Sequence, residues 1–189
     1  MQGFRHFLEL TLADLTANTQ GIQTLSRHKI VSTVAEPTGT FLRINKPANN
    51  ILFIAKFAGT DNYQTFINFL GVKFRDGQQT MFDADDGYKA INDPKTGQVH
   101  NVEMLAVDGE NVQVLCTCPD FIRTFAYANA NAGALYRTKE APINIVSGKN
   151  TVPGVCKHLL KFKDVLLSRG FLLRSKSDVA SLLRQTKRG

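Results

Sequence analysis

The sequence predicts an α+β fold in which a β-rich body follows an N-terminal amphipathic helix and precedes a helical C-terminal segment. Apolar residues recur at helical spacing near both ends of the chain. Alternating or continuous apolar runs fill much of the middle, with Gly, Pro, Asn and Asp turn signals between them. The chain has 189 residues, of which 43% are hydrophobic and 21% charged, so it is long enough to bury a core of its own.

The N-terminal helix is predicted from five apolar residues at helical spacing, and it should end near Gly21. These residues are Phe4, Phe7, Leu8, Leu12 and Leu15.

Five strands are predicted in the middle of the chain, at residues 40–44, 51–57, 63–74, 99–107 and 112–118. The third should contain a β-bulge near Gly71, because the alternating pattern occupies odd positions up to Phe69 and even positions from Val72 onward. The polar stretch 76–97 is predicted to be a loop. A turn signal at residues 108–111 predicts a hairpin between the last two strands.

The C-terminal segment is predicted to be mainly helical. Residues 120–129 favour a helix, residues 131–153 a long connection, and Ser177 could cap a last short helix that carries Val179, Leu182 and Leu183. A second amphipathic helix is indicated by Val155, Leu159, Phe162 and Leu166. We therefore divide the chain into residues 1–98, which hold the N-terminal helix and the β-rich body, and residues 99–189, which form a second unit with basic C-terminal helices.

The net charge of +7 is unevenly distributed. Residues 1–120 contain 10 Lys or Arg and 13 Asp or Glu, whereas residues 121–189 contain 13 and 3. This asymmetry indicates a nucleic acid or an acidic protein surface as the partner of the last third, although solubility alone would explain it equally well. No apolar run approaches the roughly 20 residues that a membrane span needs, so we expect no membrane association.

The candidate chemistry lies in three cysteines and one histidine. Cys116 and Cys118 form a C-x-C pair, and 37 residues later Cys156 and His158 form a C-x-H pair. An odd cysteine number argues against a secreted disulfide module. Three thiolates and one imidazole are a recognised closed ligand set for Zn²⁺. Alternate residues of a strand face the same way, so the first pair can share one face, whereas the second pair requires Cys156 before a helix and His158 in its first turn.

Three other interpretations of these residues were considered. The cysteines could be buried and inert. A catalytic Cys–His pair would need a third orienting group, which the sequence does not supply clearly. A catalytic zinc ion is disfavoured because four protein ligands leave no position for water. Structural zinc therefore accounts best for this set, and we expect no enzymatic activity.

The C-x-C and C-x-H pairs resemble the SWIM-type zinc-finger family. In that family the motif follows a β-hairpin strand and precedes an apolar helix, which implies a ββα-like zinc-finger unit that binds DNA or protein. Longer segments are similar to zinc-finger-bearing structural proteins of tailed bacteriophages. These segments are residues 116–129, 133–134 and 153–160, together with residues 7–15 and 20–22.

The phage resemblance implies a virion component of a myovirus-like particle, in the tail, baseplate or neck, which is assembled in the cytoplasm of the bacterial host. Its partners would be other virion structural proteins in a multi-subunit assembly. The alternative is a zinc module that binds nucleic acid through its basic last third. Candidate contacts to phosphate or to an acidic partner are Lys157, Lys161, Lys163 and Arg169, which also fit an ordinary solvated helix face.

Overall fold

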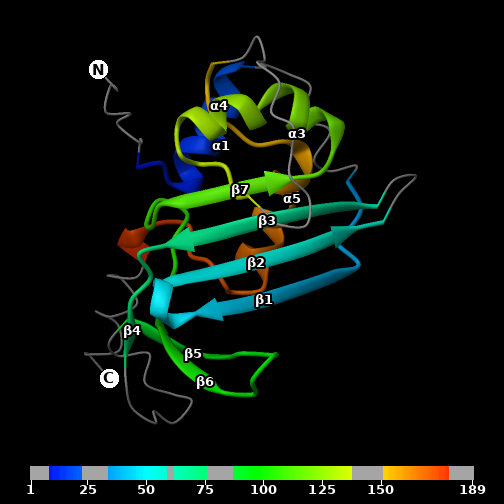
Figure 1. Ribbon diagram of the computed structural model, residues 1–189. Coiled ribbons are helices and arrows are strands. Elements are labelled where there is room, and N and C mark those ends of the chain that lie inside the picture. The colour runs from blue at the N-terminus through cyan, green and yellow to red at the C-terminus, as the bar shows by residue number, and fades with distance from the viewer. Residues whose placement is uncertain (1–8, 23–33, 59–61, 76–86, 138–150, 179–189) are drawn as a thin grey trace.

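The computed structural model describes residues 9–22, 34–58, 62–75, 87–137 and 151–178. A four-stranded antiparallel sheet forms its centre, in the order β1-β2-β3-β7, and a three-stranded antiparallel sheet in the order β4-β6-β5 lies beside it (Figure 1). The strands are β1 (Gly39–Asn45), β2 (Asn50–Phe57), β3 (Tyr63–Leu70), β4 (Phe74–Arg75), β5 (Tyr88–Asn92), β6 (Val99–Glu103) and β7 (Val112–Cys116). The predicted α+β class is therefore confirmed.

The helices lie along the β7 edge and on one face of the larger sheet (Figure 1). Helix α5 packs against β3 and β7, and α3 packs against β7. The helices are α1 (Leu12–Ile22), α3 (Pro119–Thr124), α4 (Ala126–Asn131) and α5 (Lys157–Ser168), with a 3-10 turn, η1 (Lys46–Ala48), between β1 and β2. Among the described residues, no helix is long and apolar enough to cross a membrane.

Helix α1 begins later than the apolar spacing predicted. Residues 9–11 are not helical, and the helix starts at Leu12 because Thr11 and Asp14 form a reciprocal cap. The Asp14 N–H donates to Thr11 Oγ1 over 3.2 Å, and the Thr11 N–H donates to Asp14 Oδ2 over 2.9 Å. Leu12 and Leu15 are buried as expected, whereas Phe4, Phe7 and Leu8 lie outside the described residues.

Helix α5 confirms the second amphipathic pattern. Val155, Leu159, Phe162 and Leu166 are each no more than 1% exposed. They belong to a single hydrophobic cluster that extends from α1 to the segment after α5. The division of the chain at residue 98 stays a prediction, although β7, from the second predicted unit, pairs with β3 from the first.

The predicted hairpin between residues 99–107 and 112–118 is wrong. Strand β6 pairs with β4 and β5, whereas β7 pairs with β3 in the other sheet. The turn signal does form a local turn, in which the Gly109 N–H donates to the carbonyl of Ala106 over 3.1 Å. Strand β7 is buried along most of its length and needs a neighbour with an apolar surface, which β3 provides. The hairpin part of the predicted ββα-like unit is therefore not formed.

Two further expectations are corrected between β3 and β6. The parity change at Gly71 is not a bulge, because β3 ends at Leu70 and the chain passes to the second sheet through Gly71, whose φ is +70°. Strand β5 lies within the stretch predicted to be a loop. Only Ile91 of its five residues is buried, so the segment lacks the clear alternation of apolar and polar residues by which a strand is recognised in a sequence. Residues 76–86 lie outside the described part of the chain.

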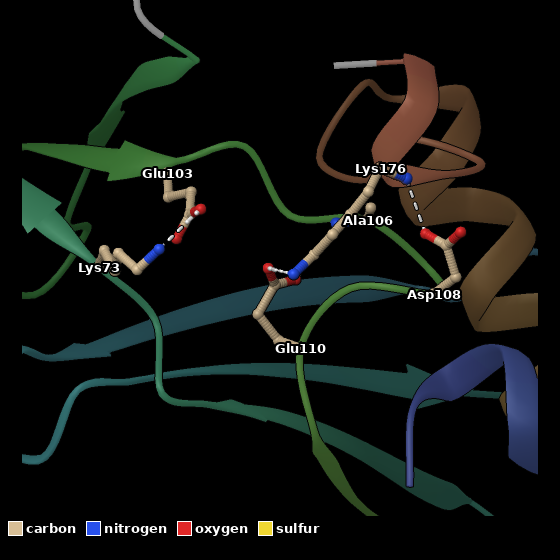
Figure 2. Close-up of polar contacts among 6 residues, drawn as sticks. All are labelled: Lys73, Glu103, Ala106, Asp108, Glu110 and Lys176. Carbon is tan, nitrogen blue, oxygen red and sulfur yellow. Dashed lines mark hydrogen bonds and ion pairs between the residues drawn. The ribbon is translucent and has the colours of Figure 1, made fainter. Parts of the chain in front are cut away.

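The segment after α5 is attached to the loop between β6 and β7 (Figure 2). The backbone N–H of Lys176 donates to Asp108 Oδ1 over 2.7 Å, and Lys176 Nζ lies 3.9 Å from Glu110 Oε1. The last described helical turn begins at Lys176. Its cap is Ser175 rather than the predicted Ser177, because Ser175 Oγ accepts from the Asp178 N–H over 3.3 Å.

The other residues predicted for this last helix, Val179, Leu182 and Leu183, lie outside the described residues.

Candidate metal centre

The four predicted ligands come together in the folded chain. Cys116, Cys118, Cys156 and His158 are all buried, and one donor atom from each lies within 4.8 Å of the others. They gather where β7 ends and where α3 and α5 begin. The predicted grouping of these residues is therefore confirmed, across a separation of 37 residues in sequence.

The first pair is positioned by the junction between β7 and α3. Cys116 is the last residue of β7, and its Sγ lies 3.5 Å from the N–H of Cys118. Cys118 is the N-cap of α3, with an extended backbone (φ −71°, ψ 148°) and a sulfur that accepts from the Phe121 N–H over 3.4 Å. Pro119 in the first helical turn stops the strand and starts the helix. The two sulfurs therefore approach each other from a strand end and a helix start.

The second pair is positioned by the N-terminus of α5. Cys156 is the N-cap residue, with an extended backbone (φ −86°, ψ 174°), and His158 lies in the first turn. This is the arrangement that the C-x-H spacing requires, because residues i and i+2 of a regular helix would point about 200° apart. Nδ1 of His158 lies 3.9 Å from Sγ of Cys116.

The approach to Cys156 is held by two buried side chains that the sequence reasoning missed. The Asn129 side chain accepts from the Gly154 N–H over 2.8 Å and donates to the Gly154 carbonyl over 2.9 Å. Thr19 Oγ1, from α1, accepts from the Val155 N–H over 2.8 Å. Asn129 is 0% exposed and Thr19 is 1% exposed. Neither residue stands out in the sequence, because α4 reads AYANAN and α1 also contains several polar residues.

Gly154 itself is required by close packing. A Cβ atom at this position would lie 2.8 Å from Phe125 Cε1 and 2.8 Å from Thr19 Oγ1. Glycine therefore allows the chain to pass between α1 and the junction of α3 and α4 on its way to Cys156.

Aromatic rings fix the position of His158. The rings of Phe57 and Tyr63, which are cross-strand partners in β2 and β3, lie 5.4 Å and 5.1 Å from the imidazole. His158 is 8% exposed, so the imidazole lies in a mainly apolar environment. Phe121 and Phe125, which are both 0% exposed, belong to the core on the other side of the cysteines.

The environments of the three thiols differ in their effect on the pKa. Burial raises the pKa of Cys116 and of Cys156 well above the ordinary thiol value. Hydrogen bonds from the Cys116 and Cys156 thiols hold the pKa of Cys118 far below that value. The N-terminus of α5 also favours negative charge on Cys156.

The donor set fits a tetrahedral metal ion. With Zn–S near 2.3 Å and Zn–N near 2.0 Å, neighbouring ligand atoms are expected about 3.6–3.8 Å apart. The 3.9 Å between His158 Nδ1 and Cys116 Sγ is a few tenths of an ångström longer than this, and ligand atoms as far apart as 4.8 Å would close by about 1 Å around an ion. With four protein ligands, such an ion would have no position open to water.

The four basic residues predicted as partner contacts lie on or next to α5, and one of them, Lys157, stands between the ligands Cys156 and His158 in sequence. Nζ of Lys161 lies 2.5 Å from Glu36 Oε1, and Nζ of Lys163 lies 3.6 Å from Asp164 Oδ1. The side chains of Lys161 and Lys163 are only 21% and 17% exposed. Arg169 donates to Thr40 Oγ1 over 3.4 Å, and Lys157 is half-buried in the first turn. Their role as partner contacts stays a prediction.

No family model, curated protein or solved structure matches this chain. The resemblance to SWIM-type zinc fingers and to phage structural proteins therefore depends on the sequence segments alone.

Proposed function

We propose that Cys116, Cys118, Cys156 and His158 bind one Zn²⁺ ion in a closed structural site. The observation that carries this proposal is the convergence of four buried thiol and imidazole groups from two distant segments. Thiolates and imidazole together favour zinc, whereas magnesium and calcium prefer oxygen ligands. The buried cluster would hold three thiolates against one divalent cation, and the N–H groups at the starts of α3 and α5 offset the remaining negative charge.

The ion would join three elements that also pack together in the hydrophobic core. It would attach the end of β7 to the starts of α3 and α5, and so fix α5 against the inner face of the larger sheet. Because metal binding in such sites contributes directly to the free energy of folding, the role is to stabilise the chain. We therefore propose a non-enzymatic protein, in agreement with four ligands that leave no open coordination position.

The wider role that we propose is a structural protein of a phage virion, in the tail, baseplate or neck, that docks on neighbouring subunits. This proposal is supported by the resemblance of residues 116–129 and 153–160 to phage structural proteins. Nucleic-acid binding through the basic last third is the alternative. It has less support from α5, because Lys161 and Lys163 already lie against Glu36 and Asp164.

Metal analysis of the purified protein tests the zinc site. We expect about one zinc per chain, since the four ligands form one site. His158→Ala and Cys156→Ser should lose zinc and expose the C-terminal third to protease. The matched control is His100→Ala, which removes a histidine from β6 that is no part of the cluster. Metal-free protein with a protease pattern unchanged in both ligand variants would refute the site.

A separate measurement tests the virion role. Mass spectrometry and cryo-EM of intact particles should find this chain bound to other virion proteins. A zinc-loaded protein that is absent from purified particles would refute the virion role and leave the zinc site intact.

A further inference from the structure

The outer face of the larger sheet is the face opposite α5 (Figure 1). It carries a row of apolar side chains across all four strands. The strand register places Phe41 of β1 beside Ile54 of β2, Ile54 beside Phe66 of β3, and Phe66 beside Leu115 of β7. Side chains alternate between faces, so this row points away from the face that carries Cys116. The ring of Tyr136 stacks on Phe66 at 5.6 Å, with 23° between the planes.

Cationic side chains border this row. Arg43 lies two residues beyond Phe41 in β1, and Lys56 lies two residues beyond Ile54 in β2, on the other side of the row. Two residues of a strand span about 7 Å, and their side chains share one face. Lys95, from the turn between β5 and β6, and Arg137, which follows Tyr136, complete the border. Nζ of Lys56 lies 5.5 Å from the centre of the Phe41 ring.

Phe41, Ile54 and Phe66 of this row, together with the cationic border, line a groove of about 830 Å³. None of the described residues that line it is acidic. Phe41 is 49% exposed, which is unusual for a phenylalanine and leaves one of its aromatic surfaces open to a ligand. Ile54 and Phe66 are only 7% and 8% exposed, so the groove presents two accessible aromatic rings, Phe41 and the half-buried Tyr136, with cationic side chains around them.

We propose that this groove binds single-stranded nucleic acid. Phosphates would lie against the four cationic side chains, and bases would stack on Phe41 and Tyr136, as in other stacking platforms. An acidic peptide would match the charge but would not require exposed rings. A free phosphate would require neither the rings nor a groove that is lined by three strands. The combination of planar apolar surface and cations favours a polyanion that carries planar bases.

This inference goes beyond the proposed zinc site and differs from nucleic-acid binding by α5. The groove lies on the sheet face opposite the cysteines, and none of the metal ligands lines it. Loss of zinc and loss of nucleic-acid binding can therefore be measured separately.

The test uses the zinc-loaded full chain with fluorescently labelled oligo(dT) and oligo(U), measured by anisotropy over a salt series. We expect binding that weakens as salt rises. Arg43→Gln and Lys56→Gln should each reduce the slope of log affinity against log salt by about 0.7, the value for one phosphate contact in a single strand. Phe41→Ala should weaken binding about 5- to 160-fold, the range for loss of one stacked base.

The matched control is Lys161→Gln with Lys163→Gln, which removes two cations from α5. Zinc content and the melting temperature of every variant check that it is folded. Salt-dependent binding of either oligonucleotide supports the proposal.

Three results would overturn the proposal. The first is the absence of binding at low salt. The second is binding that the α5 control removes while the groove variants retain it. The third is equal binding of polyglutamate, with no effect of Phe41→Ala, because that would show a charged surface that recognises no bases.

Discussion

Replacing Asn129 with alanine should destabilise the protein far more than a usual surface change. The Asn129 side chain makes both polar contacts to Gly154, over 2.8 Å and 2.9 Å, and it is 0% exposed. Alanine would leave a buried N–H and a buried carbonyl unsatisfied, each at a cost of about 1–3 kcal/mol. We expect a loss of about 3 kcal/mol in the free energy of unfolding. For a chain of this size, that lowers the melting temperature by about 6–12 °C.

The measurement is urea denaturation and thermal melting of zinc-loaded protein, with competition against a chelator to follow zinc affinity. Zinc affinity should fall as well, because the backbone that leads to Cys156 loses its anchor. Asn131→Ala, at the exposed end of α4, is the matched control and should change stability by less than about 0.5 kcal/mol. Asn129→Asp should be no better than alanine, since a carboxylate cannot donate to the Gly154 carbonyl. Equal stability of Asn129→Ala and Asn131→Ala would refute the reasoning.

Two further predictions concern Gly154 and Glu110. Gly154→Ala should destabilise the protein by about 1–3 kcal/mol in thermal melts, because the new methyl group would lie 2.8 Å from Phe125; unchanged or greater stability would show that the site is open. Burial raises the pKa of Glu110, so its contribution to stability is present below its unfolded pKa, near 4.3, and is lost as the pH rises through the higher folded value. Glu110→Gln should therefore flatten the dependence of unfolding free energy on pH across that window, and an unchanged pH dependence would contradict it.

The metal ligands could be predicted from the sequence because their chemistry depends on very short spacings. The C-x-C pair needs an extended backbone so that both thiols can share one face, and Pro119 ends that extended segment directly after Cys118. The C-x-H pair needs a helix start, and the glycine before Val155 supplies a non-helical approach. Both requirements are local, so the residue types and their neighbours were sufficient to indicate where each pair would lie.

Strand pairing could not be predicted in the same way, because it depends on distant partners. The turn signal around Gly109 is real, yet it connects two different sheets. Strand β7 pairs with β3 because β3 is buried on both faces in the folded protein. No local sequence pattern shows which distant strand will be its partner. The anchors Asn129 and Thr19 were missed for a related reason: their partners, Gly154 and Val155, lie 25 and 136 residues away in sequence.

The separation between the two ligand pairs has a consequence for the order of folding. Closing a loop of about 40 residues costs about 3 kcal/mol in chain entropy, so each pair gathers its own ligands long before the two pairs meet. Cys116 reaches the site through the pairing of β7 with β3, and Cys156 through the docking of α5. Such distant contacts form slowly. During refolding, we therefore expect zinc to become resistant to chelators only at the last long-range step, and the rate of that change to report how fast the sheet and α5 come together.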